Sequence, residues 1–143
     1  MSNILHDVSG EHKQIVRVSR QGTPSTEDFP IFESPFKCKV TKITLKAGID
    51  WIQRDVGNFN SVFVRDAGYS GTVASPLALS GTVLGSAAAV GTPFKANQPY
   101  TLYGGTASFN AARVLTLRLA LSGTAANAEP IPASLVETTF IGD

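Results

Sequence analysis

Leucine recurs at every second residue near the C-terminal end of the chain, and this alternation constrains the fold more than any other feature. The alternating residues are Leu115, Leu117, Leu119 and Leu121, separated by Thr116, Arg118 and Ala120. Successive side chains of a β-strand point to opposite faces of a sheet, so this period predicts a strand with one buried face. Segments with helical periodicity are scarce in the rest of the chain.

Four further segments have strand character: 15–20, 36–45, 61–64 and 135–141. In 36–45 the apolar residues change parity, from Phe36, Cys38 and Val40 to Ile43 and Leu45. This change predicts a β-bulge near Thr41–Lys42, or a strand that crosses between sheets. Turn signals recur at short intervals, with Gly71, Gly81 and Gly91 ten residues apart. Short strands separated by such turns predict an all-β fold, an antiparallel and jelly-roll-like β-sandwich.

The first 35 residues differ in composition from the rest, since they are polar and contain three prolines and both histidines. We expect an extended N-terminal arm over residues 1–35, with one short strand at 15–20, followed by the sandwich over 36–143. An apolar group lies at the end of the arm and comprises Phe29, Ile31, Phe32 and Phe36. Two interpretations of this group stay open: it closes the core of the domain, or it reaches a partner.

Charged residues are distributed unevenly. Residues 1–66 hold 17 of the 23 charged side chains, and residues 67–112 hold only Lys95. Because apolar residues recur throughout 67–112, we expect folded β structure there, with part of its surface against neighbouring chains, in preference to a flexible linker. The formal net charge of +1 argues against a nucleic-acid binder. No apolar run approaches the ~18 residues of a membrane span.

Motifs for catalysis and metal binding are missing from the sequence. It contains no Gly-x-Ser-x-Gly, no phosphate-binding glycine loop and no His-Glu-x-x-His. Cys38 is the single cysteine, so we expect a buried thiol and no disulfide. His6, Asp7, Glu11 and His12 are the only clustered ligand types. We interpret them as a solvated terminus, and we expect no enzyme activity, no cofactor and no metal. The sequence does not place Asp50, Asp55 and Asp66.

A group of four lysines and the single tryptophan are candidates for partner contact. Lys37, Lys39, Lys42 and Lys46 form a basic stripe. The stripe is interpreted as a solvated face or a protected sheet edge, and secondly as a contact for an acidic protein surface. Trp51 is interpreted as a core or interface residue, or as a platform for sugar binding.

The first residues of the sequence lack the charge pattern of a signal peptide, so we expect synthesis in a cytoplasm.

The order of several short motifs resembles the single-domain decoration, or cement, proteins on the heads of tailed bacteriophages. The motifs are segment 39–45, then 58–68, then Val114–Leu119 and finally Pro132–Glu137. One position departs from the pattern, because Ala112–Arg113 stands where the group has Gly-Asp. The resemblance spans about residues 37–141 and implies a structural virion protein without catalytic residues.

The resemblance implies a protein on the capsid surface, bound to the major capsid protein and to copies of itself, with a trimer as the natural ring. It implies no contact with nucleic acid or membrane. The residues expected at the partner contact are Phe29, Ile31, Phe32, Lys37, Lys39 and Trp51. Two alternatives stay open: a tail, fibre or neck component of the virion, and a carbohydrate-binding module that uses Trp51.

Overall fold

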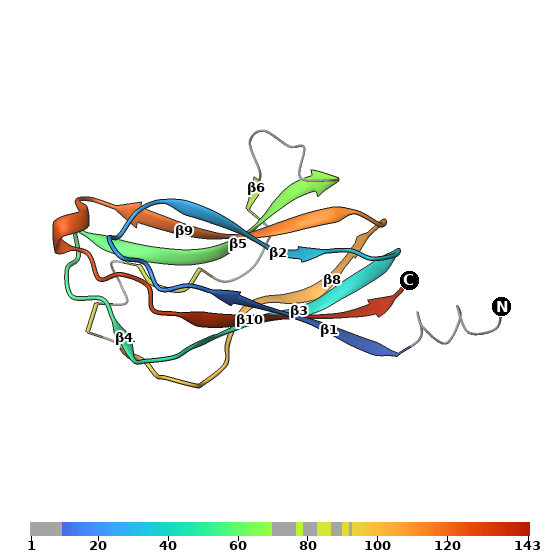
Figure 1. Ribbon diagram of the computed structural model, residues 1–143, viewed down its shortest axis with the longest axis horizontal. Helices are drawn as coiled ribbons and strands as arrows, with labels where there is room; N and C mark the ends of the chain where they lie inside the picture. Colours follow the sequence, from blue (N-terminus) through green and yellow to red (C-terminus); the bar gives the residue numbers. More distant parts are fainter. Residues whose placement is uncertain (1–9, 70–76, 79–82, 87–89, 92) are drawn as a thin grey trace.

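Two four-stranded antiparallel sheets face each other in the computed structural model, which describes residues 10–69, 77–78, 83–86, 90–91 and 93–143. Sheet A has the strand order β1-β10-β3-β8, and sheet B has the order β2-β9-β5-β6. Figure 1 shows them as two layers, with β1, β10 and β3 in the lower layer and β2, β9 and β5 in the upper one. The all-β sandwich predicted from the sequence is therefore confirmed. No helix among the described residues is long and apolar enough to cross a membrane.

The strands of sheet A are β1 (Glu11–Val18), β3 (Cys38–Ala47), β8 (Tyr100–Phe109) and β10 (Ser134–Gly142). Those of sheet B are β2 (Glu27–Glu33), β5 (Phe59–Tyr69), β6 (Leu77–Ala78) and β9 (Arg113–Ser122). A two-stranded sheet of β4 (Trp51–Ile52) and β7 (Pro93–Phe94) and a short 3-10 helix, η2 (Ala125–Asn127), complete the described elements.

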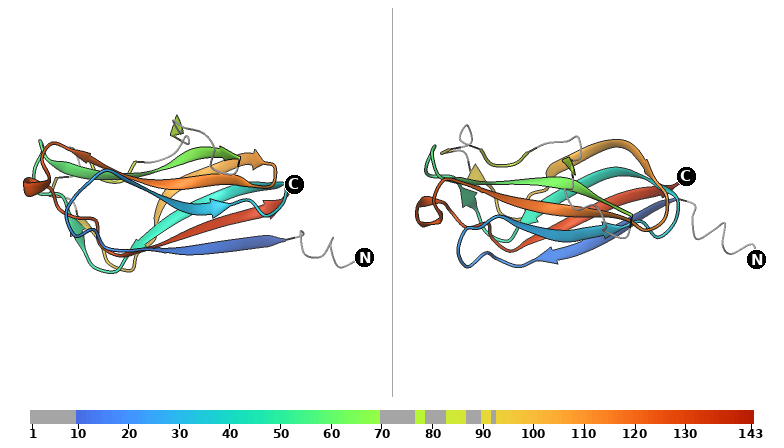
Figure 2. Two further views of the ribbon diagram at one scale, coloured as in Figure 1. Left: turned by 45° about the horizontal axis from the view of Figure 1, so that its top comes forward. Right: turned by 90° about the horizontal axis from the view of Figure 1, so that it is seen from above.

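The pairing is nested along the chain. The outermost strands β1 and β10 pair with each other, β2 pairs with β9, β3 with β8, and β5 with β6. This arrangement is a jelly roll, in which a long hairpin is wrapped so that its paired strands fall into two sheets. The views in Figure 2 show the wrapped hairpin from two further sides, with β1 beside the C-terminal strand.

The leucine alternation is explained by the position of β9 inside sheet B. Leu115, Leu117 and Leu119 are each 0% exposed and point into the core between the sheets. On sheet A, Val40, Ile43 and Val136 point into the same core and are also 0% exposed. Full burial of such side chains stabilises the fold by about 1.5–3 kcal/mol each.

The change of parity in β3 is produced by a β-bulge, which is the first of the two alternatives that the sequence leaves open. On β10, Thr139 lies opposite Lys42 and Phe140 lies opposite Val40, so Thr41 is the extra residue of β3. The Thr41 hydroxyl donates a hydrogen bond to the carbonyl oxygen of Thr139, at 3.2 Å. As a result, Val40 and Ile43 both face the core although they are three residues apart.

The N-terminal region differs from the expected arm. Residues 11–18 pair with β10 along the whole of β1, and residues 27–33 pair with β9. The domain therefore includes residues from about Gly10 onward, and the boundary expected at residue 36 is corrected. The local sequence gives no sign that the first strand pairs with the last one, and for this reason residues 11–18 could not be assigned to the sandwich. Residues 1–9 of the expected arm, with His6 and Asp7, lie outside the described residues.

One end of the sandwich is closed by a buried polar cluster of Gln21, Gln53 and Asn60. Gln53 and Asn60 are 0% exposed, and Gln21 is 5% exposed. The Gln53 amide donates to the carbonyl oxygen of Asn60, and the Asn60 amide donates to the carbonyl oxygen of Glu129 at 2.8 Å. Gln21 accepts a hydrogen bond from the NH of Ile131 at 3.0 Å. Since buried polar groups need partners, this cluster fixes the three connections that meet there.

Candidate functional site

Of the three carboxylates that the sequence leaves unplaced, Asp50 and Asp55 lie at separate turns and Asp66 lies on β5. Asp50 accepts the NH of Ala96 at 2.8 Å, and this hydrogen bond lowers the pKa of Asp50. Asp55 accepts the NH of Gly57 at 2.7 Å, which lowers its pKa in the same way. Among the described residues, no three His, Cys, Asp or Glu side chains group as metal ligands would. Asp50 and Asp55 therefore organise turns.

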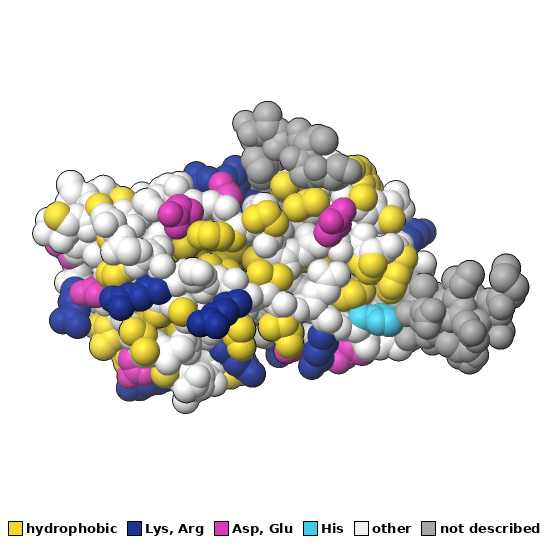
Figure 3. Space-filling view, viewed as in Figure 1, with side chains coloured by type: hydrophobic (Ala, Val, Ile, Leu, Met, Phe, Trp, Pro, Cys, Tyr) yellow, Lys and Arg dark blue, Asp and Glu magenta, His cyan; other side chains and the backbone are white. Residues whose placement is uncertain are grey.

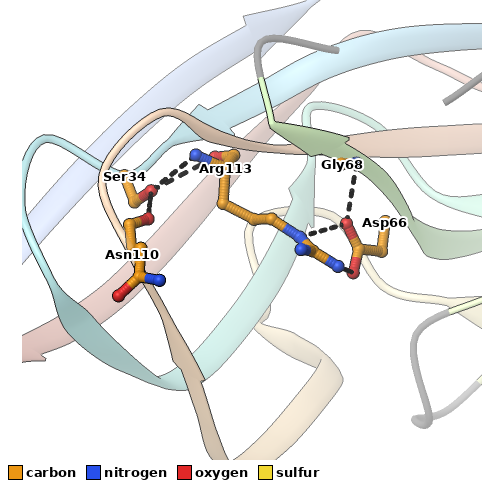
Figure 4. A network of polar contacts seen from close by, with 5 residues as sticks. All are labelled: Ser34, Asp66, Gly68, Asn110 and Arg113. Atoms are coloured by element: carbon orange, nitrogen blue, oxygen red, sulfur yellow. Dashed lines mark hydrogen bonds and ion pairs between the residues drawn. The ribbon is translucent and has the colours of Figure 1, made fainter. Parts of the chain in front are cut away.

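Asp66 and Arg113 form a bidentate ion pair on sheet B (Figure 4). The same figure shows the Ser34 hydroxyl, which donates a hydrogen bond to the carbonyl oxygen of Asn110. The Arg113 Nε donates to Asp66 Oδ1 at 2.8 Å, and the NH of Gly68 donates to the same oxygen at 2.9 Å. The two side chains are 18% and 27% exposed. Burial raises the pKa of Asp66, but the hydrogen bonds from Arg113 and Gly68 and the charge of Arg113 outweigh it and lower the pKa overall.

We expect Asp66→Asn to lower the free energy of unfolding at pH 7 by about 1–3 kcal/mol, because it leaves a partly buried guanidinium without its charged partner. The folded-state pKa of Asp66 is below the unfolded value of ~3.9. The stabilisation is therefore present above that value and is lost as pH falls through the lowered one. Urea titrations at pH 7 and pH 3 should show the difference from wild type shrink at pH 3. An equal difference at both pH values, or one matched by the exposed control Glu33→Gln, would contradict this role.

Trp51 belongs to β4 of the small β4–β7 sheet, and its side chain is buried. It is 3% exposed, and its ring stacks on Phe94 with a centroid distance of 4.8 Å. Phe94 in turn meets Tyr100 edge to face at 5.3 Å. A sugar platform must present an open aromatic face, so the structure removes the residue on which the carbohydrate alternative depends. Trp51 belongs to the core.

The apolar group of the expected arm also lies in the domain. Ile31 and Phe32 are 1% and 3% exposed, and Phe29 is half-buried and packs against the core. Phe32 meets Phe140 of β10 edge to face at 5.2 Å, so β2 of sheet B contacts sheet A through these rings. Of the two interpretations of this group, the structure supports closure of the domain's own core.

The lysines of the basic stripe gather on the outer face of sheet A. Because the bulge inserts one residue, Lys39, Lys42 and Lys46 all point away from the core, although an unbroken strand would place Lys39 and Lys42 on opposite faces. Lys37 is exposed just before β3. From β1, Lys13 and Arg17 point the same way. We call this set the basic face: Lys13, Arg17, Lys39, Lys42 and Lys46.

The register of the three strands arranges the basic face in rows. Lys13, Thr139 and Lys42 lie opposite one another across β1, β10 and β3. A second row, four residues away from the first along each strand, consists of Arg17, Leu135 and Lys46. The row between them consists of Ile15, Glu137 and Thr44. In Figure 3, Lys and Arg side chains form a band along the lower layer, interrupted by acidic and apolar side chains.

Only part of this positive charge is neutralised. Lys13 pairs with Glu137 at 3.3 Å, and Lys39 pairs with Asp143 at 3.4 Å. Arg17, Lys42 and Lys46 have no ion pair with any described residue. Three apolar side chains are exposed on the same face: Ile15 at 60%, Leu135 at 47% and Ile141 at 36%.

Two hollows lie over the rows. One, of about 310 Å³, is lined by Arg17, Lys46 and Leu135 together with Ala47, Gly48, Asn97, Ala133 and Ser134. The other, of about 510 Å³, lies over Lys13, Thr139 and Lys42 and is also lined by Glu11, Thr41, Thr44, Lys46, Pro99 and Glu137. Lys46 lines both, so the two hollows are adjacent.

The sequence identified Lys39 and the stripe, but it missed Arg17, Leu135 and Ile15. These three residues lie at alternate, outward-facing positions of β1 and β10. Only the register of the two strands shows that they share a face with the lysines of β3.

No protein-family model matches this chain, and no curated protein or solved structure shows significant similarity to it.

Proposed function

We propose that this protein is a structural component of a bacteriophage virion that binds the outer surface of the capsid and stabilises the shell by bridging neighbouring subunits of the major capsid protein. The observation that carries the proposal is the outer face of sheet A, which combines unpaired cations with exposed Ile15 and Leu135. Exposed apolar side chains among polar ones are typical of surfaces that bind proteins.

The architecture suits a mechanical role. The basic face lies on a sheet backed by a closed core, so little ordering of backbone is needed when a partner binds. Many copies on one shell amplify modest contacts, because neighbouring contacts hold each bridged subunit in place. The jelly roll occurs in viral capsid proteins but also in lectins and cupins, so the fold alone does not assign the function.

A tail, fibre or neck component is the second candidate, since it needs the same kind of docking surface. Copy number separates the two. A shell protein arranged as trimers around local threefold points is present in on the order of hundreds of copies, whereas a neck or tail ring holds about six or twelve.

The test compares phage particles that carry the protein with particles from which its gene has been deleted. We expect the deleted particles to release their genome at a lower temperature, and the added purified protein to restore the wild-type temperature. Quantitative mass spectrometry of the wild-type particle gives the copy number relative to the major shell protein. Equal heat resistance with and without the protein would overturn the stabilising role.

A further inference from the structure

The rows of the basic face have a spacing that matches an extended peptide. The row of Lys13, Thr139 and Lys42 and the row of Arg17, Leu135 and Lys46 are separated by four residues along each strand. At ~3.3 Å per residue, this separation is about 13 Å. Residues i and i+4 of an extended chain point to the same side and are separated by the same distance.

Each of these rows offers a place for one carboxylate. In the first row, Lys13 and Lys42 flank Thr139, and in the second, Arg17 and Lys46 flank Leu135. The hollows of about 510 Å³ and 310 Å³ lie over the two rows. A carboxylate in either hollow lies between cations from β1 and β3. Arg17, Lys42 and Lys46 have no competing ion pair among the described residues, whereas Lys13 is paired with Glu137, and Glu11 and Glu137 also line the first hollow.

The middle row selects against a third carboxylate. It contains Glu137, whose charge repels an acidic side chain, and Ile15, which is 60% exposed. An apolar side chain at position i+2 of the peptide covers Ile15 and avoids Glu137. The pair of Glu137 with Lys13, at 3.3 Å, leaves Lys42 as the cation of the first row without an ion pair among the described residues.

We propose that the basic face binds an extended segment of a partner protein with an acidic residue at position i, an apolar residue at i+2 and a second acidic residue at i+4. This inference rests on the proposed function for the identity of the partner, which is then a segment of the major shell protein. The binding chemistry itself is independent of that identity and is tested separately.

The first experiment measures binding of synthetic peptides to the full-length protein by NMR titration. The probe peptide has the sequence Ser-Glu-Thr-Val-Thr-Glu-Ser, with its carboxylates four residues apart and Val between them. The control peptide, Ser-Glu-Thr-Val-Glu-Thr-Ser, has the same composition, but its carboxylates point to opposite sides of an extended chain. We expect the probe to bind more tightly and to shift the amide signals of β1, β10 and the second half of β3.

The matched variants are Lys42→Glu with Lys46→Glu on the basic face, and Arg20→Glu with Arg54→Glu outside it. All four side chains are exposed, and both double variants change the net charge equally; in the second, Arg54→Glu also removes the ion pair of Arg54 with Glu129 at 2.7 Å. We expect the first double variant to weaken probe binding roughly tenfold to hundredfold, since two attractive contacts become repulsive. The second should bind as wild type does. Thermal unfolding of each variant verifies that the fold is retained.

Three results would overturn the inference. They are equal binding of both peptides, equal weakening by both double variants, and tighter binding of a DNA duplex than of the probe in the same buffer. The last result would assign the face to a nucleic acid.

The capsid assay separates this inference from the proposed function. If the wild-type protein and both double variants bind shells equally, the protein is a shell component that docks through another surface, and the inference fails alone. If the wild-type protein does not bind shells but the probe peptide binds as expected, the proposed function fails and the peptide-binding face stands.

Discussion

Gly85→Ala should destabilise the protein by roughly 2–5 kcal/mol, because two separate costs add at this position. The backbone of Gly85 has φ of +74°, a conformation that favours glycine. A Cβ atom there would lie 2.5 Å from the carbonyl oxygen of Asn60, 2.6 Å from Trp51 and 2.9 Å from the Gln53 amide. The neighbours belong to the buried polar cluster and to the core, so they have little room to move. Chemical denaturation at neutral pH measures the loss.

Gly91→Ala is the matched control for the backbone cost alone. Its φ is +80°, and a Cβ atom added to it would meet no atom of the described residues within 4 Å. We expect Gly91→Ala to cost about 1–2 kcal/mol, the conformational penalty by itself. If the two variants lose the same free energy of unfolding, close packing around Gly85 contributes nothing and the argument for the sealed end of the sandwich is wrong.

Trp51→Ala is the second change with a large expected effect. It removes a side chain that is 3% exposed and stacked on Phe94, and such truncations cost about 3–5 kcal/mol. An exposed sugar platform would show no such cost on truncation. The midpoint of urea unfolding distinguishes the two roles directly.

Trp51→Phe provides the control for shape. Phenylalanine keeps an aromatic ring against Phe94 and removes the Trp51 Nε1–H, which is buried without a hydrogen-bond partner among the described residues. We expect Trp51→Phe to lose clearly less stability than Trp51→Ala. Glycan binding that disappears in Trp51→Phe while stability is unchanged would restore the carbohydrate alternative.

The local features of the fold were predictable because their signals lie within one strand. The leucines of β9 alternate, and the parity change near Thr41–Lys42 limits this strand to a bulge or a crossing between sheets, of which the structure has the bulge. Strand order was beyond the sequence, because the nested pairs join segments as distant as Glu11 and Ile141. The extent of the domain depended on the same pairs, and for this reason Ile31 and Phe32 could be assigned either to the core or to a partner contact.

The candidate site was predictable only in part. The lysines of β3 are visible in the sequence, and their common direction follows from the bulge. The contributions of Arg17 and Leu135 depend on the register, which sets them in one row with Lys46. The role of Trp51 could not be predicted, because a tryptophan can form a sugar platform or a part of the core. Its stacking on Phe94, which in turn contacts Tyr100, decides for the core.

The position of β10 between β1 and β3 also determines when the protein can fold during synthesis. Segment 134–142 is the last strand along the chain, yet it supplies the backbone partners of both β1 and β3. While the ribosome still holds this segment, β1 has no partner in sheet A and β3 can pair only with β8. Sheet A therefore cannot be completed before segment 134–142 has been synthesised, and folding is slow for a domain of this size because most pairings join distant residues. A nascent chain stalled before residue 134 would leave the backbone edges of β1 and β3 that face β10 unpaired and open to chaperones and proteases.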